Sequence, residues 1–242
     1  MKKVCSLLIL AMLGWILFRA FIALPSPSER KAFGVASRHI RRHAVEDTGA
    51  VNLVAAVLFD YRALDTLGEV TVIFSAAASV ALLFSSQRKP PAISEGLSPI
   101  VKRSIAALTP FMFLVGFYIV LHGHISPGGG FQGGVVWGSL LILLGIAYGS
   151  LPAEKVVTRT AKTAMECLGA LGFVGLACLG LFTGEWLFSN VAAGYPRGTP
   201  GTIVSAGAIP LLSIAVGVKI GAGLSAIFYC MVNEEEEGSD GI

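Results

Sequence analysis

The chain has 242 residues, of which 54% are apolar and a further 29 are glycine, so about two thirds of it is apolar or glycine. Soluble domains are about 45–50% apolar and about 25% charged, whereas 14% of this chain is charged. The excess cannot be buried in one soluble core, so the composition indicates an integral membrane protein. The net charge of +3 is small and forms no clustered basic patch, which disfavours nucleic-acid binding.

Long apolar stretches predict the membrane-spanning helices, because a hydrocarbon core of about 30 Å requires roughly 20 apolar residues of helix. Six segments meet this length, at residues 4–24, 67–86, 104–121, 133–150, 161–182 and 203–232. A seventh apolar stretch, 51–59, is too short to cross and is predicted to be an interfacial or re-entrant helix. The expected fold class is an all-α integral membrane protein with about six transmembrane helices and one such short helix.

Residues 25–48 carry five basic side chains around His39 and His43. We expect this segment to face solvent or lipid headgroups, and the arginines disfavour a metal site because they repel a cation. The four cysteines of the chain have no CxxC spacing and no histidine at ligand distance, which supports neither a zinc nor an iron–sulfur site. We therefore expect no bound metal and no bound cofactor.

Basic residues also predict the orientation. Four lie between the second and third spans and three at the junction of the fourth and fifth, namely Arg88, Lys89, Lys102, Arg103, Lys155, Arg159 and Lys162. The other short loops hold only Arg197. Because short cytoplasmic loops are rich in Lys and Arg, we expect a multi-pass protein of the cell (inner) membrane with these loops and both termini in the cytoplasm. The basic segment 25–48 would then lie outside, which counts against this orientation.

Ionisable residues inside the spans are candidates for function, because each costs a few kcal/mol at membrane depth. Asp65 and Glu69 share one helix face, and Glu69 is followed by a long uncharged run. Two such carboxylates cannot both ionise easily, so one could carry a proton or bind a cation. Alternatively, Asp65 caps the helix and Glu69 occupies its first turn, where the helix dipole favours a negative charge.

Lys219 lies inside the last span, far in sequence from other charges. A lysine there needs a partner carboxylate or a hydrated path, and its neutral form could itself carry protons. In the predicted orientation Glu69 and Lys219 would be successive stations on one ion path rather than one ion pair. Arg19 and Glu166 lie near span ends, where snorkelling to the interface explains them.

A glycine-rich run joins the third and fourth spans from His122 to Gly134, with the sequence HGHISPGGGFQGG. Two interpretations stay open: an unwound element that lines a cavity beside an ion path, or a close-packing joint between helices. Zinc binding by His122 and His124 has weak support, since two ligands do not make a site. Residues 198–207 form a similar stretch, which could place small residues against a neighbouring helix.

These residues carry a resemblance to a known family. From about Ser104 onward, and above all in the run from His122 to Gly134, the chain resembles the B subunit of the multisubunit Mrp-type Na⁺/H⁺ antiporters. Residues 4–87, with the run DYRALDTLGE at 60–69, resemble the C-terminal end of the large A subunit of these antiporters, or the equivalent small subunit of membrane-bound hydrogenases. The domains expected are a two-span region, 1–95, and a four-span region, 96–242.

The resemblance implies a membrane subunit of a multisubunit Na⁺/H⁺ antiporter module that contributes to cation and proton translocation, with Na⁺ and H⁺ as the transported ions. The alternative is a structural or ion-path subunit of the similar module of a membrane-bound hydrogenase or related reductase. The partners implied are large pump-like subunits, small membrane subunits and, in the alternative, the hydrogenase or reductase module. We expect no enzymatic activity of the chain itself, and it contains neither a G-x-S-x-G nor an H-E-x-x-H motif.

The candidate site residues form two groups. For the ion path they are Glu69, Asp65 and Lys219. For gating or packing in the glycine-rich run they are His122, His124, Pro127, Gly128, Gly129, Gly130 and Phe131. The resemblance implies that Glu69 matches a membrane carboxylate of the ion path, and that Pro127 and Phe131 match functional positions of the B subunit. The chain departs from the family at Lys219, where the family often has an acidic residue.

Overall fold

The structure is a computed structural model that describes residues 11–12, 14–16, 18–19, 22, 31–84, 96–149 and 157–232. The chain divides into two compact units, 1–42 and 43–242. The predicted first span, 4–24, lies mostly outside the described residues, although its described positions are helical.

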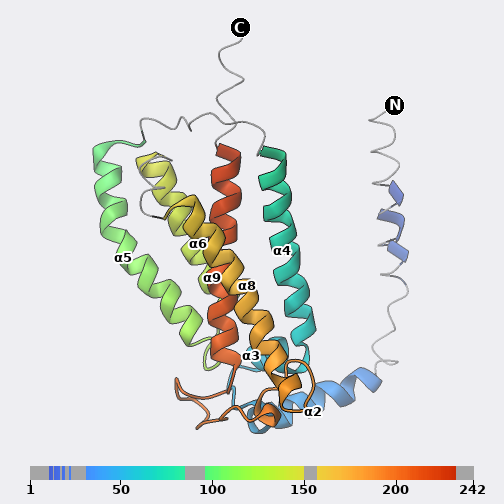
Figure 1. Ribbon diagram of the computed structural model, residues 1–242. Helices are drawn as coiled ribbons and strands as arrows, with labels where there is room; N and C mark the ends of the chain where they lie inside the picture. The colour runs from blue at the N-terminus through green and yellow to red at the C-terminus, as the bar shows by residue number, and fades with distance from the viewer. Residues whose placement is uncertain are drawn as a thin grey trace. The chain divides into compact units, whose positions relative to one another are not determined.

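Five helices of the described chain are long and apolar enough to cross a membrane (Figure 1). They are α4 (Ala63–Phe84), α5 (Pro99–Leu121), α6 (Gly130–Tyr148), α8 (Arg159–Phe182) and α9 (Ile209–Val232). They correspond to the second to sixth predicted spans, and the described residues contain no β-strand. The all-α membrane class is therefore confirmed.

The last span begins at Ile209 rather than at residue 203, which corrects the prediction. Ala206 and Gly207 have φ angles of 67° and 61°. These left-handed conformations cannot continue a right-handed helix. Residue 198 also forms an isolated antiparallel bridge with Ser205, so the apolar residues before Ile209 belong to a folded loop.

Helix α9 is the centre of the bundle and packs against α4, α6 and α8. In its most apolar stretch 56% of the residues are buried, compared with 11% in α4. Glycines allow this crowding, because helix backbones approach closely where side chains are small. A Cβ on Gly134 of α6, for example, would lie 2.7 Å from the carbonyl oxygen of Gly217 in α9.

The short helix predicted at 51–59 is present as α3 (Leu53–Ala56) followed by the π-helical turn η1 (Val57–Tyr61). Asn52 begins it, since its side-chain oxygen accepts a hydrogen bond from the Val54 N–H at 3.0 Å. The same side chain donates to the carbonyls of Gly123, at 2.7 Å, and Ser126, at 2.9 Å. The short helix is thereby fixed to the loop between α5 and α6.

Three loop segments gather at this end of the bundle, at 49–62, 122–129 and 183–208, the last of which contains the short helix η2 (Val191–Ala193) (Figure 1). Helix α2 (Lys31–Thr48) ends here. Its last turn is held by Arg197, which donates to the Glu46 carbonyl at 2.7 Å, and by Tyr61, which donates to Asp47 at 2.5 Å. The described basic residues of the predicted cytoplasmic loops lie near the starts of α5 and α8, at the opposite end.

Candidate functional site

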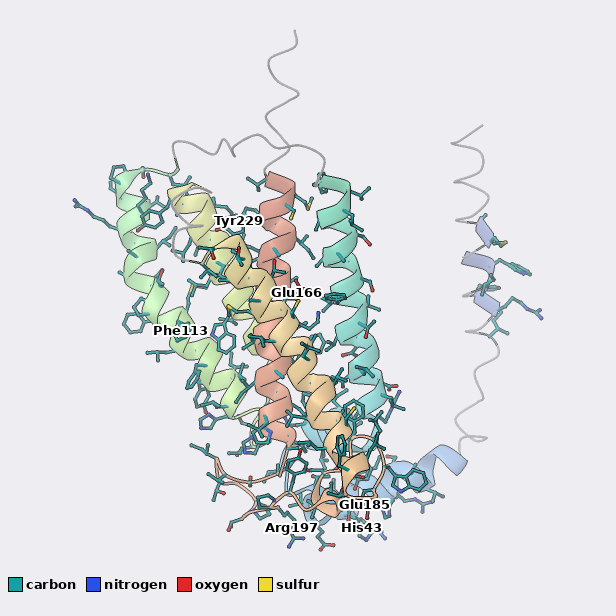
Figure 2. All side chains as sticks on the ribbon, in the orientation of Figure 1. His43, Phe113, Glu166, Glu185, Arg197 and Tyr229 are labelled. Atoms are coloured by element: carbon teal, nitrogen blue, oxygen red, sulfur yellow. The ribbon has the colours of Figure 1, made fainter. Side chains whose placement is uncertain are left out.

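The most deeply buried charge in the described membrane helices is Lys219, whose side chain is 1% exposed near the middle of α9. Its Nζ lies 3.9 Å from Oε1 of Glu166 in α8, whose side chain is 10% exposed. Figure 2 shows Glu166 on the part of α8 that crosses α9. A buried lysine needs a carboxylate of this kind, because an isolated charge in the interior costs several kcal/mol.

The surroundings of this pair are apolar and tightly packed. The Nζ atom of Lys219 lies 5.5 Å from the centre of the Phe74 ring of α4. A Cβ on Gly223 would lie 3.3 Å from Oε1 of Glu166, and one on Gly169 would lie 2.8 Å from the Lys219 Cβ. Neither Lys219 Nζ nor Glu166 Oε1 has a hydrogen-bond partner among the described residues. Each charge therefore depends on the other.

Lys162 lies on α8 one turn before Glu166, toward the start of that helix. Lys162 is 3% exposed, and its Nζ lies 3.3 Å from the centre of the Tyr229 ring of α9. Tyr229 in turn donates a hydrogen bond to the Leu141 carbonyl of α6 at 2.9 Å. Lys162, Glu166 and Lys219 thus form a column of buried polar side chains between α8 and α9.

Glu69 and Asp65 lie elsewhere, on the exposed face of α4. Both are exposed, and Asp65 forms an ion pair with Arg62, one turn earlier. Glu69 lies about 140° around the helix from Phe74, at 100° per residue, so it does not face Lys219. The described residues contain no ion pair between Glu69 and Lys219. Within the part of the chain that the structure describes, these two predicted ion-path residues therefore do not form a pair.

The glycine-rich run contributes packing at its helical end. Gly129 has a φ angle of 135°, which favours glycine, and α6 begins at the next residue. Gly130 lies against Ser213 and Val216 of α9, which fits the interpretation as a close-packing joint. Phe131 is half-buried, and Pro127 is exposed on the preceding loop together with Gly128, which is half-buried.

The two histidines of this run have different surroundings. The ring of His122 stacks on Tyr118, with 4.2 Å between the centres. His124 is 1% exposed, and its Nε2 lies 3.2 Å from the Thr202 carbonyl oxygen. Burial lowers the pKa of His124, which favours the neutral ring, and Nε2 is the donor to Thr202 because a carbonyl oxygen can only accept. Among the described residues, no group of three or more His, Cys, Asp or Glu side chains could hold a metal ion.

A second acidic position lies at the loop end, on η1. Burial raises the pKa of Asp60 from 3.8 to about 6, the charge of Asp47 adds to this effect, and a hydrogen bond with Asn190 opposes it. The buried Asn190 also accepts from the Ala208 N–H at 2.8 Å and donates to the Ala206 carbonyl at 3.2 Å. Asp60 is therefore connected through Asn190 to the residue that precedes α9.

Sequence reasoning did not select Glu166, Asp60 or Asn190. The sequence places Glu166 near a span end, but it lies 7 residues into α8, about 10 Å at 1.5 Å per residue. The signal that could have found it is the opposite sign of Glu166 and Lys219 in two consecutive spans. No sequence signal distinguishes Asn190, because its partners come from separate loops.

Comparison with known protein families covers nearly the whole chain. Residues 100–226 match the family model described as a domain related to the MnhB subunit of Na⁺/H⁺ antiporter. Residues 4–102 match the model described as the E subunit of MBH. The protein MJ1307 of Methanocaldococcus jannaschii is 34% identical over 205 residues, which cover 76% of this chain and 78% of that protein. The protein mnhB2 of Staphylococcus aureus (strain Newman) is 42% identical over 97 residues, 36% of this chain and 69% of that protein.

Two solved structures are similar to the chain along almost its full length. One belongs to the membrane-bound sulfane sulfur reductase, an archaeal respiratory membrane complex, with a TM-score of 0.75 and 32% identity over 96% of this chain and 99% of that chain. The other belongs to the Mrp complex from Dietzia sp. DQ12-45-1b. It has a TM-score of 0.67 and 23% identity, covers 98% of this chain and 26% of that chain, and shows the fold alone.

Proposed function

Because the chain belongs to the family of domains related to the MnhB subunit of Na⁺/H⁺ antiporters, we propose that it is a membrane subunit of a multisubunit complex that exchanges Na⁺ for protons. Its Glu166–Lys219 pair lies on the ion path of that complex. The observation that carries this proposal is a lysine, 1% exposed near the middle of α9, with the Glu166 carboxylate 3.9 Å away.

The energetics of the pair support a role beyond stability. Replacing a buried ion pair by apolar side chains of similar volume is often neutral or stabilising by about 1–4 kcal/mol. The bundle already has close helix contacts without the pair, for example between Gly134 and Gly217. A charged pair that stability does not require, at membrane depth, is typical of ion and proton paths.

We assign Glu69 and Asp65 to a part of the path that a neighbouring subunit completes. Glu69 is exposed on α4, and a carboxylate that faced hydrocarbon there would be costly. A helix or a hydrated surface of a partner subunit would remove that cost. In the predicted orientation, the starts of α5 and α8 face the cytoplasm.

The test uses the complete complex in proteoliposomes and measures Na⁺-dependent proton transport. The decisive variant is Glu166→Gln with Lys219→Met, because removal of both charges leaves no unpaired charge in the core. We expect an assembled complex whose transport is reduced at least tenfold. Glu185→Gln is the matched control, because it is also an acid-to-amide change but lies in the exposed loop after α8 (Figure 2). A complex with this variant should transport normally. Normal transport by the double variant would overturn the proposal.

A second candidate is the same role in a redox-driven complex. It is favoured by the likeness to the sulfane sulfur reductase chain, which extends over 96% of this chain. Purification of the tagged full chain from its native membranes distinguishes the two. Subunits that carry redox centres would co-purify in the second case, and only membrane transport subunits in the first.

A further inference from the structure

We propose that the Glu166–Lys219 pair transfers protons and does not bind sodium ions. This inference rests on the proposed function and names the ion that the site handles. It follows from the atoms around the pair, from the regular backbone of both helices and from the chemistry of an amine beside a carboxyl group.

A sodium ion has no adequate ligands at this place. Hard cations are bound by several oxygen atoms, which in membrane transporters include carbonyls freed by broken helices. Helices α8 and α9 are unbroken at Glu166 and Lys219, so their carbonyls are engaged in helix hydrogen bonds. Against the pair lie the Phe74 ring, Ile73 and Gly223, and none of these adds a side-chain oxygen to that of Glu166.

The lysine also occupies the position that a cation would need. Its ammonium lies 3.9 Å from the carboxylate oxygen. A sodium ion at a similar distance from that ammonium would be repelled by about 4 kcal/mol at an effective dielectric constant of 20. A sodium ion could bind to Glu166 only after Lys219 had moved away or lost its proton.

Proton transfer within the pair meets neither obstacle. One N–H bond of the Lys219 ammonium breaks, one O–H bond forms on Glu166, and the ion pair becomes a neutral amine beside a neutral carboxylic acid. Both states have no net charge, so the transfer leaves no uncompensated charge in the apolar core. The 3.9 Å separation exceeds the 2.7–3.2 Å of an N–H···O hydrogen bond. A rotamer change of the flexible lysine, or one bridging water, would close this gap.

The column of buried polar side chains between α8 and α9 indicates the route that such protons would take. Lys162 precedes Glu166 by four residues, about 6 Å along α8 at 1.5 Å per residue, and lies toward the helix end that carries Arg159. It is buried against Tyr229. Protons would therefore pass between the basic end of the bundle and its middle, whereas the exposed Glu69 lies on another face.

The test separates the maximal rate of transport from the KM for Na⁺ in proteoliposomes that hold the complete complex. Lys219→Arg keeps the positive charge beside Glu166, but arginine does not release its proton in proteins. We expect the maximal rate to fall at least tenfold while the KM for Na⁺ stays within twofold of the native value. Glu166→Gln, which has nearly the native size, carries the same expectation if the larger guanidinium prevents assembly.

Two results would overturn the inference. An increase of tenfold or more in the KM for Na⁺ with a retained maximal rate would assign the pair to sodium. Normal transport by Lys219→Arg would reduce it to a structural ion pair. The double variant Glu166→Gln with Lys219→Met distinguishes the two levels: its normal transport would refute the proposed function, whereas a sodium-specific defect would refute only the assignment to protons.

Discussion

Gly169 of α8 lies against Lys219 of α9 so closely that no side chain fits between the two backbones at this level. A Cβ at position 169 would come within 2.7 Å of the Ala215 carbonyl oxygen and 2.8 Å of the Lys219 Cβ. Glu166 lies one turn earlier on the same helix. The contact at Gly169 therefore holds the backbones of α8 and α9 close together beside the Glu166–Lys219 pair.

Gly169→Ala should push α8 and α9 apart, because the added methyl group meets backbone atoms. We expect the free energy of unfolding to fall by about 1–3 kcal/mol, a loss typical of an overpacked core. A lower Tm of the purified full chain in detergent would show it. Gly175→Ala is the matched control on the same helix, since a Cβ there meets nothing within 4 Å. Its expected effect is neutral or a gain of up to about 1 kcal/mol from helix propensity. An unchanged Tm for Gly169→Ala would contradict the close approach.

Asn52→Ala should weaken the attachment of the short helix α3 to the loop between α5 and α6, leaving the backbone hydrogen bond from the N–H of residue 52 to the His124 carbonyl. The change removes two donors to the Gly123 and Ser126 carbonyls and the acceptor for the Val54 N–H. We expect the free energy of unfolding to fall by about 1–3 kcal/mol, which a lower Tm of the purified full chain would show. Asn52→Asp keeps the acceptor but loses both donors. If Asn52→Asp were as stable as the native chain, the contacts with the loop would contribute nothing.

The membrane helices could be predicted because their signal is local. A run of about 20 apolar residues identifies a span without any knowledge of its neighbours, and five such spans are present among the described residues. The start of α9 could not be placed in this way. Residues 203–208 are nearly as apolar as a span, and the left-handed conformations of Ala206 and Gly207, together with the bridge between Gly198 and Ser205, show that they form a loop.

Which carboxylate pairs with Lys219 depends on how the helices pack, and helix packing cannot be read directly from the sequence. A buried lysine predicts some carboxylate, and Glu69 and Glu166 were both available in other spans. The choice of Glu166 follows from the glycines that bring α8 against α9. Glu69, the residue that the family resemblance selects, lies on the outer part of α4, and its role in transport stays a prediction.

Asp60 should make the stability of the protein depend on pH. Its pKa rises to about 6 on folding, mainly because of burial, so the folded state holds the proton more tightly than the unfolded state. The stability that the protonated Asp60 carboxyl group contributes is complete below about pH 4. It is lost as the pH rises through about 6. Asp60→Asn cannot ionise, so its Tm should rise relative to the native chain across this window and then stay higher.

Asp47→Asn provides the companion measurement for Asp60. Asp47 contributes to the raised pKa of Asp60 through its negative charge, after burial as the main cause. Removal of that charge should shift the upper end of the pH window downward while leaving its direction unchanged. A constant difference in Tm between Asp60→Asn and the native chain from about pH 4 to 7 would show that Asp60 does not titrate in this way.

His124 should produce a pH dependence of the opposite sign. Burial lowers its pKa from 6.5, so below that pH the unfolded chain takes up a proton that the folded state resists. The stability that its neutral ring contributes is complete above pH 6.5 and is lost as the pH falls. His124→Gln retains an N–H donor for the Thr202 carbonyl but has no such proton to bind. The decline in Tm below pH 6.5 should therefore be smaller in this variant. His122→Gln should retain most of the decline, since the charge of His122 is a lesser cause of the lowered pKa. An equal decline in His124→Gln and the native chain would assign the acid sensitivity to another group.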